Sequence, residues 1–377
     1  MRVLQISNYF FPHIGGIEQV AKDVTKALEG KCEQKVFCFN HERPDSIEVY
    51  EGISVVRAGS FAKVSSQSLS FSYGKLLKKT VKTFNPHVII FHFPNPFGAH
   101  YLLKILKKRP DIKLVLYWHL DIFKQKLLKK LFKGQTKRLI LRAEKIVATS
   151  PNYIEGSEWL KNYKEKCVVI PNSVDEKNLA LTEQEIKKAE VIRLENAGKT
   201  ILFAMGRHVP YKGIEYLVRA SKYLDDSFKV YIGGEGELTE SLKEIAKDDK
   251  KVVFLGRISD TYKKAFYSAC DIFCFPSITK NEAFGIALAE AMYYGKPAVT
   301  FTIAGSGVNY VSLNNVTGLE VENSNPQAFA DAIKKLAEDK ELSKKYGEAA
   351  SKRVKENFLF SNFAQNIDNL VKDVTVK

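Results

Sequence analysis

The chain has 377 residues, more than the ~100–200 residues of a usual domain, so we expect two domains. Hydrophobic residues make up 45% and charged residues 27%, which excludes a mainly disordered or fibrous protein, and no apolar run approaches the ~18–20 residues of a membrane span. The 58 Lys and Arg residues exceed the 43 Asp and Glu residues by 15. This excess indicates either an anionic partner, such as a phospholipid surface, a polyphosphate or a nucleic acid, or a lysine-rich surface that only faces water.

The N-terminal residues and the cysteines bear on the cellular compartment. Residues 1–16 contain one early Arg2 and no small-residue cleavage site, so we expect a buried strand and a loop rather than a secretory signal. The five cysteines are an odd number and are scattered along the chain, which favours reduced thiols over a disulfide framework. We therefore expect a cytoplasmic protein.

Short apolar runs alternate with amphipathic stretches along most of the chain. Near-continuous apolar runs of this length favour strands of a parallel sheet that is covered on both faces. A first series of strands is expected at 2–7, 35–40, 88–93, 113–118 and 145–150, and a second at 200–206, 228–234, 251–256, 271–277 and 297–303. A polar stretch at 176–199 separates the two series, and helices are expected at 326–339, 342–358 and 362–374.

Two successive series of this kind predict two doubly wound, Rossmann-like α/β domains that face a cleft. We expect an N-terminal Rossmann-like domain at 1–178, a C-terminal Rossmann-like domain at 179–358, and a helix at 359–377 that crosses back to the N-terminal domain. Open α/β sheets bind ligands beyond the carboxyl ends of their strands, so the segments that directly follow strands are the candidates for a site.

A pair of glycines follows the first strand of the first series, and two cations follow the first strand of the second series. Gly15 and Gly16 precede a helix, where backbone amides can approach a phosphate closely. The pair lacks the spacing of a dinucleotide fingerprint, so a tight turn without a ligand is the simpler interpretation of that motif alone. Arg207 and Lys212 flank the loop after the strand at 200–206. There a guanidinium and an ammonium can neutralise a diphosphate, although solvent-facing cations are the alternative.

Two glutamates and a helix start follow the strand at 271–277. Glu282 lies in the loop, and Glu290 comes eight positions later, which at ~100° per residue brings it to within about 80° of the same face of a helix. Each carboxylate can accept hydrogen bonds from a diol, and the amides at Phe284 and Gly285 can receive a phosphate or a sugar hydroxyl. A ligand with a diol, a diphosphate and a second diol is a nucleotide sugar.

With these motifs in place, the chain resembles a known enzyme family. The Glu282/Glu290 pair and the segments PHIGGIE (12–18), VIPNSVD (169–175) and GRHVPYKG (206–213) are similar to the retaining glycosyltransferases of family 4, which have the GT-B fold. The motifs occur in the family's order over nearly the whole chain. The resemblance implies transfer of a sugar from a nucleotide diphosphate donor with retention at the anomeric carbon.

The resemblance also implies roles for the two domains and for individual residues. The N-terminal domain at 1–178 would bind the acceptor, and the C-terminal domain at 179–358 would bind the nucleotide sugar. Glu290 would hold the ribose hydroxyls, and Glu282 would lie beside the donor sugar together with the start of the helix. Arg207 and Lys212 would bind the diphosphate, and the glycine loop would allow the first domain to close over it. The whole predicted donor-binding set is Gly15, Gly16, Arg207, Lys212, Phe284, Gly285, Ile286 and Glu290.

His119 and Asp121 complete the predicted catalytic set with Glu282. A histidine at this place contacts the donor sugar in the family, and Asp121 could orient it or the acceptor. A Thr or Ser often stands before this histidine, where this chain has Trp118, and a structural histidine is the alternative. His41, His87, His92, His100 and His208 show no metal spacing, and no Asp-x-Asp motif is present, so we expect catalysis without a metal.

The donor and acceptor are predicted less specifically. The segment 304–322 is similar to one in bacterial mannosyl- and rhamnosyltransferases of surface polysaccharide assembly, which favours GDP-mannose as the donor. Residues 75–145 contain 18 basic and three acidic residues. Within them, Phe123, Leu127 and Leu131 recur among lysines that include Lys124 and Lys126, as in an amphipathic helix on an anionic membrane. The alternative is that the apolar residues pack on the core of the first domain and the lysines only face water. A lipid-linked or oligosaccharide acceptor and a peripheral location on the inner face of the membrane would explain this segment.

Other functions remain open on the residues alone. A sugar phosphorylase or a nucleotide-sugar epimerase could share two Rossmann-like domains, but we find no signature of a bound cofactor or a phosphate site. A non-enzymatic basic protein that binds membranes would leave Glu282 and Glu290 without a role. A nucleic-acid partner is not expected, because aromatic platforms with interleaved basic residues are missing from the sequence.

Overall fold

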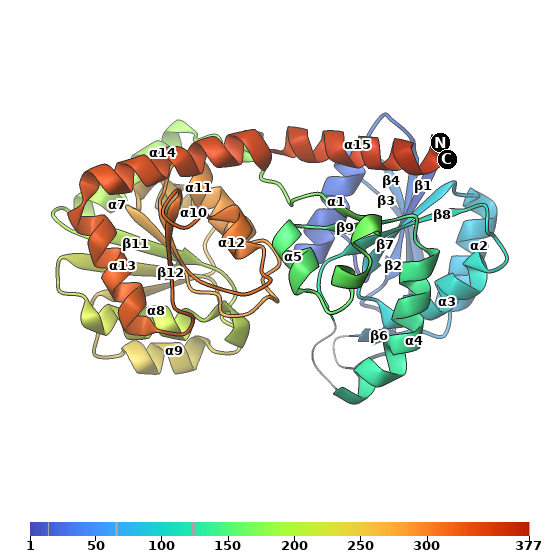
Figure 1. The fold of residues 1–377 in the computed structure, drawn as a ribbon, viewed down its shortest axis with the longest axis horizontal. Coiled ribbons are helices and arrows are strands. Elements are labelled where there is room, and N and C mark those ends of the chain that lie inside the picture. Colours follow the sequence, from blue (N-terminus) through green and yellow to red (C-terminus); the bar gives the residue numbers. More distant parts are fainter. Residues whose placement is uncertain (14, 65–66, 122–125, 377) are drawn as a thin grey trace. The chain divides into compact units, whose positions relative to one another are not determined.

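The computed structural model describes residues 1–13, 15–64, 67–121 and 126–376, and its elements are labelled in Figure 1. The chain forms two compact units. Unit 1 contains Met1–Thr149, Ser157–Ile170 and Ser361–Lys377, and unit 2 contains Ser150–Gly156 and Pro171–Phe360. The C-terminal helix, predicted at 359–377, thus belongs almost entirely to the same unit as the first strand.

Unit 1 is built on an eight-stranded sheet with the order β10-β9-β8-β7-β1-β2-β4-β3. Its strands are β1 (Arg2–Ile6), β2 (Glu33–Phe39), β3 (Ser46–Tyr50), β4 (Ile53–Ala58), β7 (Val88–Phe93), β8 (Lys113–Trp118), β9 (Lys145–Ala148) and β10 (Cys167–Val169), and β5 (Ala62–Val64) and β6 (Gln67–Leu69) form a separate pair. Its helices are α1 (Gly16–Ala27), α2 (Tyr73–Phe84), α3 (Pro96–Leu106), α4 (Lys126–Arg142) and α15 (Phe360–Val376).

All pairings of the large sheet are parallel except that of β3 with β4. These two strands form a hairpin that the analysis of apolar runs did not predict. The edge strand β3 leaves Ile47 and Val49 69% and 73% exposed, so it has no buried apolar face to give a pattern. Glu51 and Gly52 turn the hairpin with φ of 46° and 80°, the left-handed region that two-residue hairpin turns require.

Unit 2 is built on a six-stranded parallel sheet with the order β13-β12-β11-β14-β15-β16. Its strands are β11 (Thr200–Met205), β12 (Phe228–Gly233), β13 (Val252–Gly256), β14 (Ile272–Phe275), β15 (Ala298–Phe301) and β16 (Gly318–Val321). Its helices are α5 (Pro151–Gly156), α6 (Glu176–Leu179), α7 (Glu183–Glu195), α8 (Ile214–Ala220), α9 (Thr239–Ala246), α10 (Asp260–Ala269), α11 (Ile286–Tyr293), α12 (Val308–Val311), α13 (Pro326–Glu338) and α14 (Lys340–Asn357).

The central strands of both sheets are buried on both faces, as their apolar runs predict. Every residue of β7, β14 and β15 is buried. Helices therefore cover both faces of each sheet, and the predicted fold class of two parallel, doubly wound α/β sheets is confirmed. Among the described residues, no helix is both long and apolar enough to cross a membrane.

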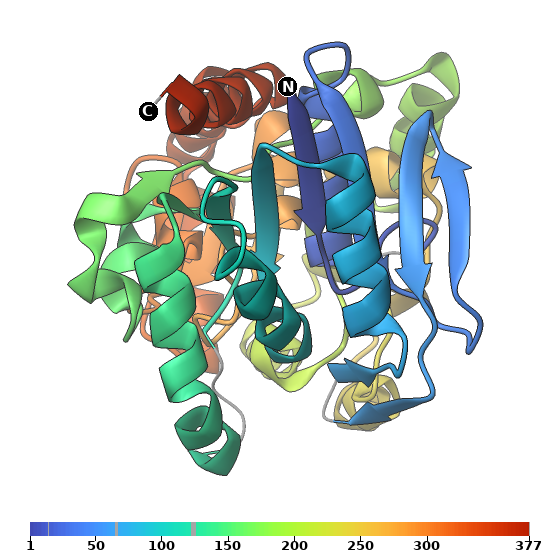
Figure 2. The ribbon, with the colours of Figure 1, turned by 90° about the vertical axis from the view of Figure 1, so that its right-hand side faces the viewer.

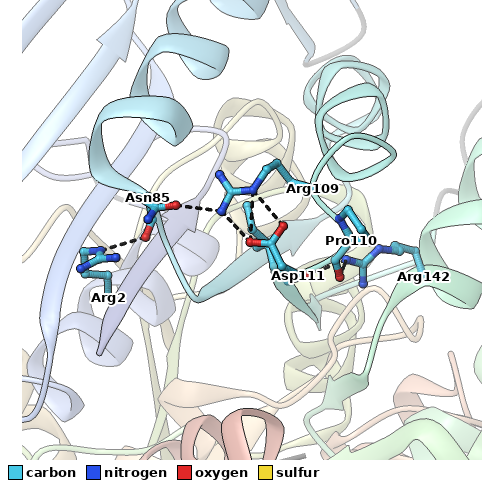
Figure 3. Close-up of polar contacts among 7 residues, drawn as sticks. Arg2, Asn85, Arg109, Pro110, Asp111 and Arg142 are labelled. Atoms are coloured by element: carbon cyan, nitrogen blue, oxygen red, sulfur yellow. Dashed lines mark hydrogen bonds and ion pairs between the residues drawn. The ribbon is translucent and has the colours of Figure 1, made fainter.

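A polar network ties together the amino ends of three neighbouring strands of unit 1 (Figure 3). Arg2 Nε donates to Asn85 O at 2.8 Å, and Arg109 Nη2 donates to Asn85 Oδ1 at 2.8 Å. Arg109 also pairs with Asp111 at 2.6 Å, and Arg142 donates to a carbonyl of the same loop at 3.2 Å. Because these contacts lie at the amino edge, the opposite edge of the sheet is left for ligand-binding loops.

Candidate active site

The carboxyl ends of β11 and β14 bring two predicted site residues together in unit 2. The two strands are parallel neighbours, so the loops that follow them meet at one edge of the sheet. Lys212 Nζ, from the first loop, donates to Glu282 Oε2, from the second. Their side chains are only 15% and 12% exposed. A partly buried ion pair therefore joins the two loops.

Gly213 allows the loop that carries Lys212 to approach β14 closely. Its φ is 59°, and a Cβ at this position would lie 2.1 Å from Pro276 O. A larger residue would push the loop away from the strand end. Lys212 Nζ lies 5.1 Å from the centroid of the Phe275 ring, so the ammonium is held directly over the end of β14.

Arg207 lies in the same loop as Lys212 but in a more open position. Arg207 is exposed, and its Nη2 donates to Tyr211 OH at 3.3 Å. The guanidinium is therefore accessible to an anion at the edge of unit 2 where the ion pair lies. The structure thus places both predicted diphosphate-binding cations in one loop.

The start of α11 follows Glu282 at the same strand end. Gly285 is the N-cap of the helix with φ of 93°, a backbone conformation that side chains rarely adopt. Phe284 is buried, with its ring edge-on to Phe358 at 5.3 Å, and Ile286 begins the helix. Because the first N–H groups of a helix lack partners within it, this segment offers donors to an anion or a hydroxyl.

Glu290, in the second turn of α11, is held by two residues of α10. Tyr267 OH donates to Glu290 Oε2 at 2.9 Å, and Lys263 Nζ donates to Glu290 Oε1 at 3.2 Å. The side chain of Glu290 remains 17% exposed. Both carboxylate oxygens are thus oriented by the protein while retaining lone pairs for further hydrogen bonds.

The electrostatics around Glu290 keep both partners protonated. Burial, followed by the Glu290 carboxylate, raises the pKa of Tyr267 well above its usual value. Burial lowers the pKa of Lys263, but the Glu290 and Asp260 carboxylates outweigh it and leave the pKa raised. The phenol and the ammonium therefore remain hydrogen-bond donors throughout the physiological pH range.

The glycine loop of unit 1 forms the start of α1. Gly15 is the N-cap in an extended conformation, and α1 begins at Gly16. A Cβ on Gly15 would lie 2.2 Å from Glu18 Oε2, so the buried Glu18 carboxylate lies against the helix start, where a negative charge is stabilised. Ile14 of this motif lies outside the described residues.

His119 and Asp121 follow β8 at the carboxyl edge of the unit 1 sheet. Both are buried, at 7% and 3% exposure. His119 Nε2 lies 2.9 Å from His92 Nδ1. Asp121 Oδ1 accepts from Trp118 Nε1 at 3.0 Å and from Ser157 Oγ at 2.8 Å. These contacts anchor the loop after β8 to the segment at 157–170.

The structure groups the predicted residues within each unit and adds residues that the motifs did not reveal. Lys212 contacts Glu282 directly, whereas Glu290 contacts α10 instead. The sequence did not reveal Tyr267 and Lys263, because their contacts with Glu290 join two different helices and leave no signal in the spacing along the chain. Within the described part of the chain, no group of three or more His, Cys, Asp or Glu is arranged to hold a metal ion.

Comparisons with known proteins show to which family the chain belongs. Residues 14–178 match the family described as Glycosyltransferase Family 4, and residues 185–353 match Glycosyl transferases group 1. D-rhamnosyltransferase WbpZ of Pseudomonas aeruginosa is 31% identical over 364 residues, which cover 95% of this chain and 92% of that protein. The chain belongs to glycosyltransferase family 4. The expectation drawn from the motifs is thereby confirmed, as is a retaining enzyme that uses a nucleotide sugar.

Further similarities place this family 4 glycosyltransferase among other enzymes of its fold. O-antigen chain mannosyltransferase C of Escherichia coli is 29% identical over 374 residues, which cover 98% of both chains. Sucrose-phosphate synthase from Thermosynechococcus elongatus superposes with a TM-score of 0.81 at 18% identity, covering 100% of this chain and 99% of that one. HepE of Anabaena, in complex with UDP-glucose, superposes with a TM-score of 0.78 at 18% identity, covering 99% and 100%. These structures share the GT-B fold with this enzyme.

Proposed function

We propose that this family 4 glycosyltransferase moves mannose, or a closely related hexose, from a GDP-sugar to a growing surface polysaccharide. The observation that carries the proposal is similarity over almost the full length to a mannosyltransferase and a D-rhamnosyltransferase. D-rhamnose is 6-deoxymannose, so the names of both relatives refer to sugars with the ring configuration of mannose. UDP-glucose, bound in a protein of the same fold, is the competing donor.

Unit 2 supplies the groups that would bind such a donor. Arg207 would receive the diphosphate with its exposed guanidinium, and Lys212 would share its ammonium between Glu282 and a phosphate oxygen. The amides of Phe284, Gly285 and Ile286 would add further donors at the helix start. Glu290, oriented by Tyr267 and Lys263, would accept hydrogen bonds from the ribose diol.

Catalysis in this proposal rests on position and charge. Fixed cations stabilise the negative charge that grows on the departing diphosphate, and they need no reorganisation during the reaction. The acceptor hydroxyl attacks from the face that the diphosphate leaves, which retains the anomeric configuration. His119 and Glu282 would contact the donor sugar, while Asp121 would hold the loop of His119 in place.

Unit 1 carries a surface suited to a lipid-linked acceptor. Helices α2, α3 and α4 cover one face of its sheet (Figure 2). Together they contain twelve Lys and Arg residues and no Asp or Glu. The three helices on this face of the sheet therefore carry basic residues without acidic ones, which favours an anionic membrane as the partner. Phe123 and Lys124, part of the predicted amphipathic pattern, lie outside the described residues.

A donor screen tests the proposal. The full chain is incubated separately with GDP-mannose, UDP-glucose and GDP-mannose plus inorganic phosphate, with a lipid-linked oligosaccharide as acceptor, and release of the nucleotide diphosphate is followed. We expect release from GDP-mannose that depends on the acceptor. Release of UDP from UDP-glucose, without release of GDP from GDP-mannose, would refute GDP-mannose as the donor. Release of GDP that requires inorganic phosphate would indicate a phosphorylase. An Arg207→Ala variant, expected to lose activity, controls for contaminating enzymes.

A further inference from the structure

Three buried polar side chains form a continuous chain of hydrogen bonds in unit 1. Gln5 comes from β1, His92 from β7, and His119 from the end of β8, which are adjacent strands in that order. Gln5 Oε1 lies 2.9 Å from His92 Nε2, and His92 Nδ1 lies 2.9 Å from His119 Nε2. Their exposed fractions are 1%, 0% and 7%. The hydrogen-bonded chain therefore runs from the core to the carboxyl edge of the sheet.

The surroundings keep the two imidazoles parallel and uncharged. The rings of His92 and His119 are stacked with centroids 5.2 Å apart, and the Tyr117 ring stacks on both, at 5.4 and 4.9 Å. Burial lowers the pKa of His92 to about 3. Burial, and then the neighbouring His92, lowers the pKa of His119 well below its usual value. Each ring is thus neutral and carries one N–H.

These contacts determine which nitrogen of each ring carries the hydrogen. The structure turns the carbonyl oxygen of Gln5 to His92 and leaves the buried Gln5 Nε2 without a hydrogen-bond partner among the described residues. In this orientation of the amide the oxygen can only accept, so His92 Nε2 is the N–H of that ring. His92 Nδ1 is then a lone pair, and it can bond to His119 only if His119 Nε2 carries the hydrogen. The Nδ1 of His119 is left as a hydrogen-bond acceptor. The direction of every bond follows from the single acceptor at Gln5. The reversed amide would place the hydrogen of His119 on Nδ1, which is the outcome that overturns the assignment.

We propose that Gln5 and His92 are positioning residues that hold His119 in the tautomer with its hydrogen on Nε2. His119 then presents Nδ1 as an acceptor, and the group that it recognises must be a hydrogen-bond donor. This second part rests on the proposed function, in which His119 contacts the donor sugar. The recognised group is accordingly a sugar hydroxyl, and neither a ring oxygen nor a phosphate oxygen can replace it.

The tautomer is tested directly by nitrogen NMR of the full chain with labelled histidine, with the resonances of His119 assigned from a His119→Gln variant. We expect His119 to show a protonated Nε2 and a lone pair on Nδ1. In Gln5→Met and in His92→Phe, each of which breaks one link, we expect a mixture of tautomers. Tyr117→Phe, which keeps the stacked ring and removes only the hydroxyl, should match the native protein. A protonated Nδ1 in the native protein, or a native pattern in both link variants, would overturn the proposal.

Kinetics test the consequence for the sugar. A mixture of tautomers leaves about half of the molecules with a lone pair on Nδ1, so we expect the donor KM to rise about twofold in Gln5→Met and His92→Phe. Loss of the whole neutral hydrogen bond in His119→Ala should lower kcat/KM about tenfold. Deoxyfluoro donors, which cannot donate a hydrogen at the substituted position, should show a similar loss at one position. The same analogue should show no loss relative to the parent donor in His119→Ala. If no position behaves in this way while the NMR result holds, the role of His119 in the proposed function is wrong, but the tautomer assignment remains.

Discussion

The hydrogen bond between Tyr267 and Glu290 gives a prediction whose size follows from the structure. Tyr267 is fully buried, and its hydroxyl donates to the Glu290 carboxylate at 2.9 Å. A hydrogen bond to a charged group contributes about 1.5–3 kcal/mol, and no solvent can replace the hydroxyl at this buried position. We expect Tyr267→Phe to lower the free energy of opening of unit 2 by about 2 kcal/mol, which corresponds to roughly 30-fold faster amide exchange.

A double-mutant cycle tests the reason for this loss. In a Glu290→Gln background the same hydroxyl would face a neutral amide, and its removal should cost only about 0.5–1.5 kcal/mol. The coupling between the two substitutions should therefore be about 1 kcal/mol or more. An equal cost of Tyr267→Phe in both backgrounds would refute the reasoning, because the carboxylate would then contribute nothing to the bond.

Hydrogen exchange followed by mass spectrometry is the suitable assay, since it reports each unit separately. Peptides from 260–293 give the expected change, and peptides from unit 1 serve as the internal reference. Tyr262→Phe is the matched control, because Tyr262 lies on the same helix but is 46% exposed. Tryptophan fluorescence would not report this change directly, since Trp118 and Trp159 both belong to unit 1.

Three further predictions concern the donor and the membrane. Lys212→Met should weaken GDP binding about tenfold or more in calorimetry, because it removes a charge-assisted hydrogen bond. Lys222→Met, at an exposed position of the same unit, should leave the affinity unchanged. Equal affinities of the two variants would exclude a role of Lys212 in diphosphate binding. Treatment with EDTA should leave the rate of GDP release unchanged, because protein cations supply the charge, and a loss restored by Mg²⁺ would contradict this. Replacing Lys78, Lys107 and Lys137 by Gln should reduce binding to anionic vesicles at low salt. The same replacement of Lys243, Lys247 and Lys250 in unit 2 should have little effect. Equal reductions in the two triple variants would show that only net charge matters.

The parallel sheets could be predicted from the sequence because their strands are buried on both faces. Val88–Phe93 has no exposed position, so its composition alone identifies it. The hairpin of β3 and β4 could not be predicted in this way, because the edge strand Ser46–Tyr50 has mostly exposed residues and pairs through its backbone. Hydrophobic periodicity reports burial, and an edge strand with little burial gives no such signal.

The candidate site, like the fold, could be predicted from the sequence only in part. Lys212 and Glu282 could be selected because each follows a strand, and parallel strands bring such residues to one edge. Tyr267 and His92 could not be selected, since an aromatic residue on an apolar helix face and a histidine within a strand are usually part of the core. Their importance depends on which side chains meet across neighbouring elements, and spacing along the chain does not contain that information.

The division of the chain between the two units has a consequence for synthesis on the ribosome. Unit 2 ends at Phe360, whereas unit 1 needs Ser361–Lys377, where α15 carries Asp368 to within 3.7 Å of Lys31. All residues of unit 2 have therefore been translated while the first unit still lacks its final helix. The domain that begins first is completed last, because its early strands are joined by a segment that is translated after all of unit 2.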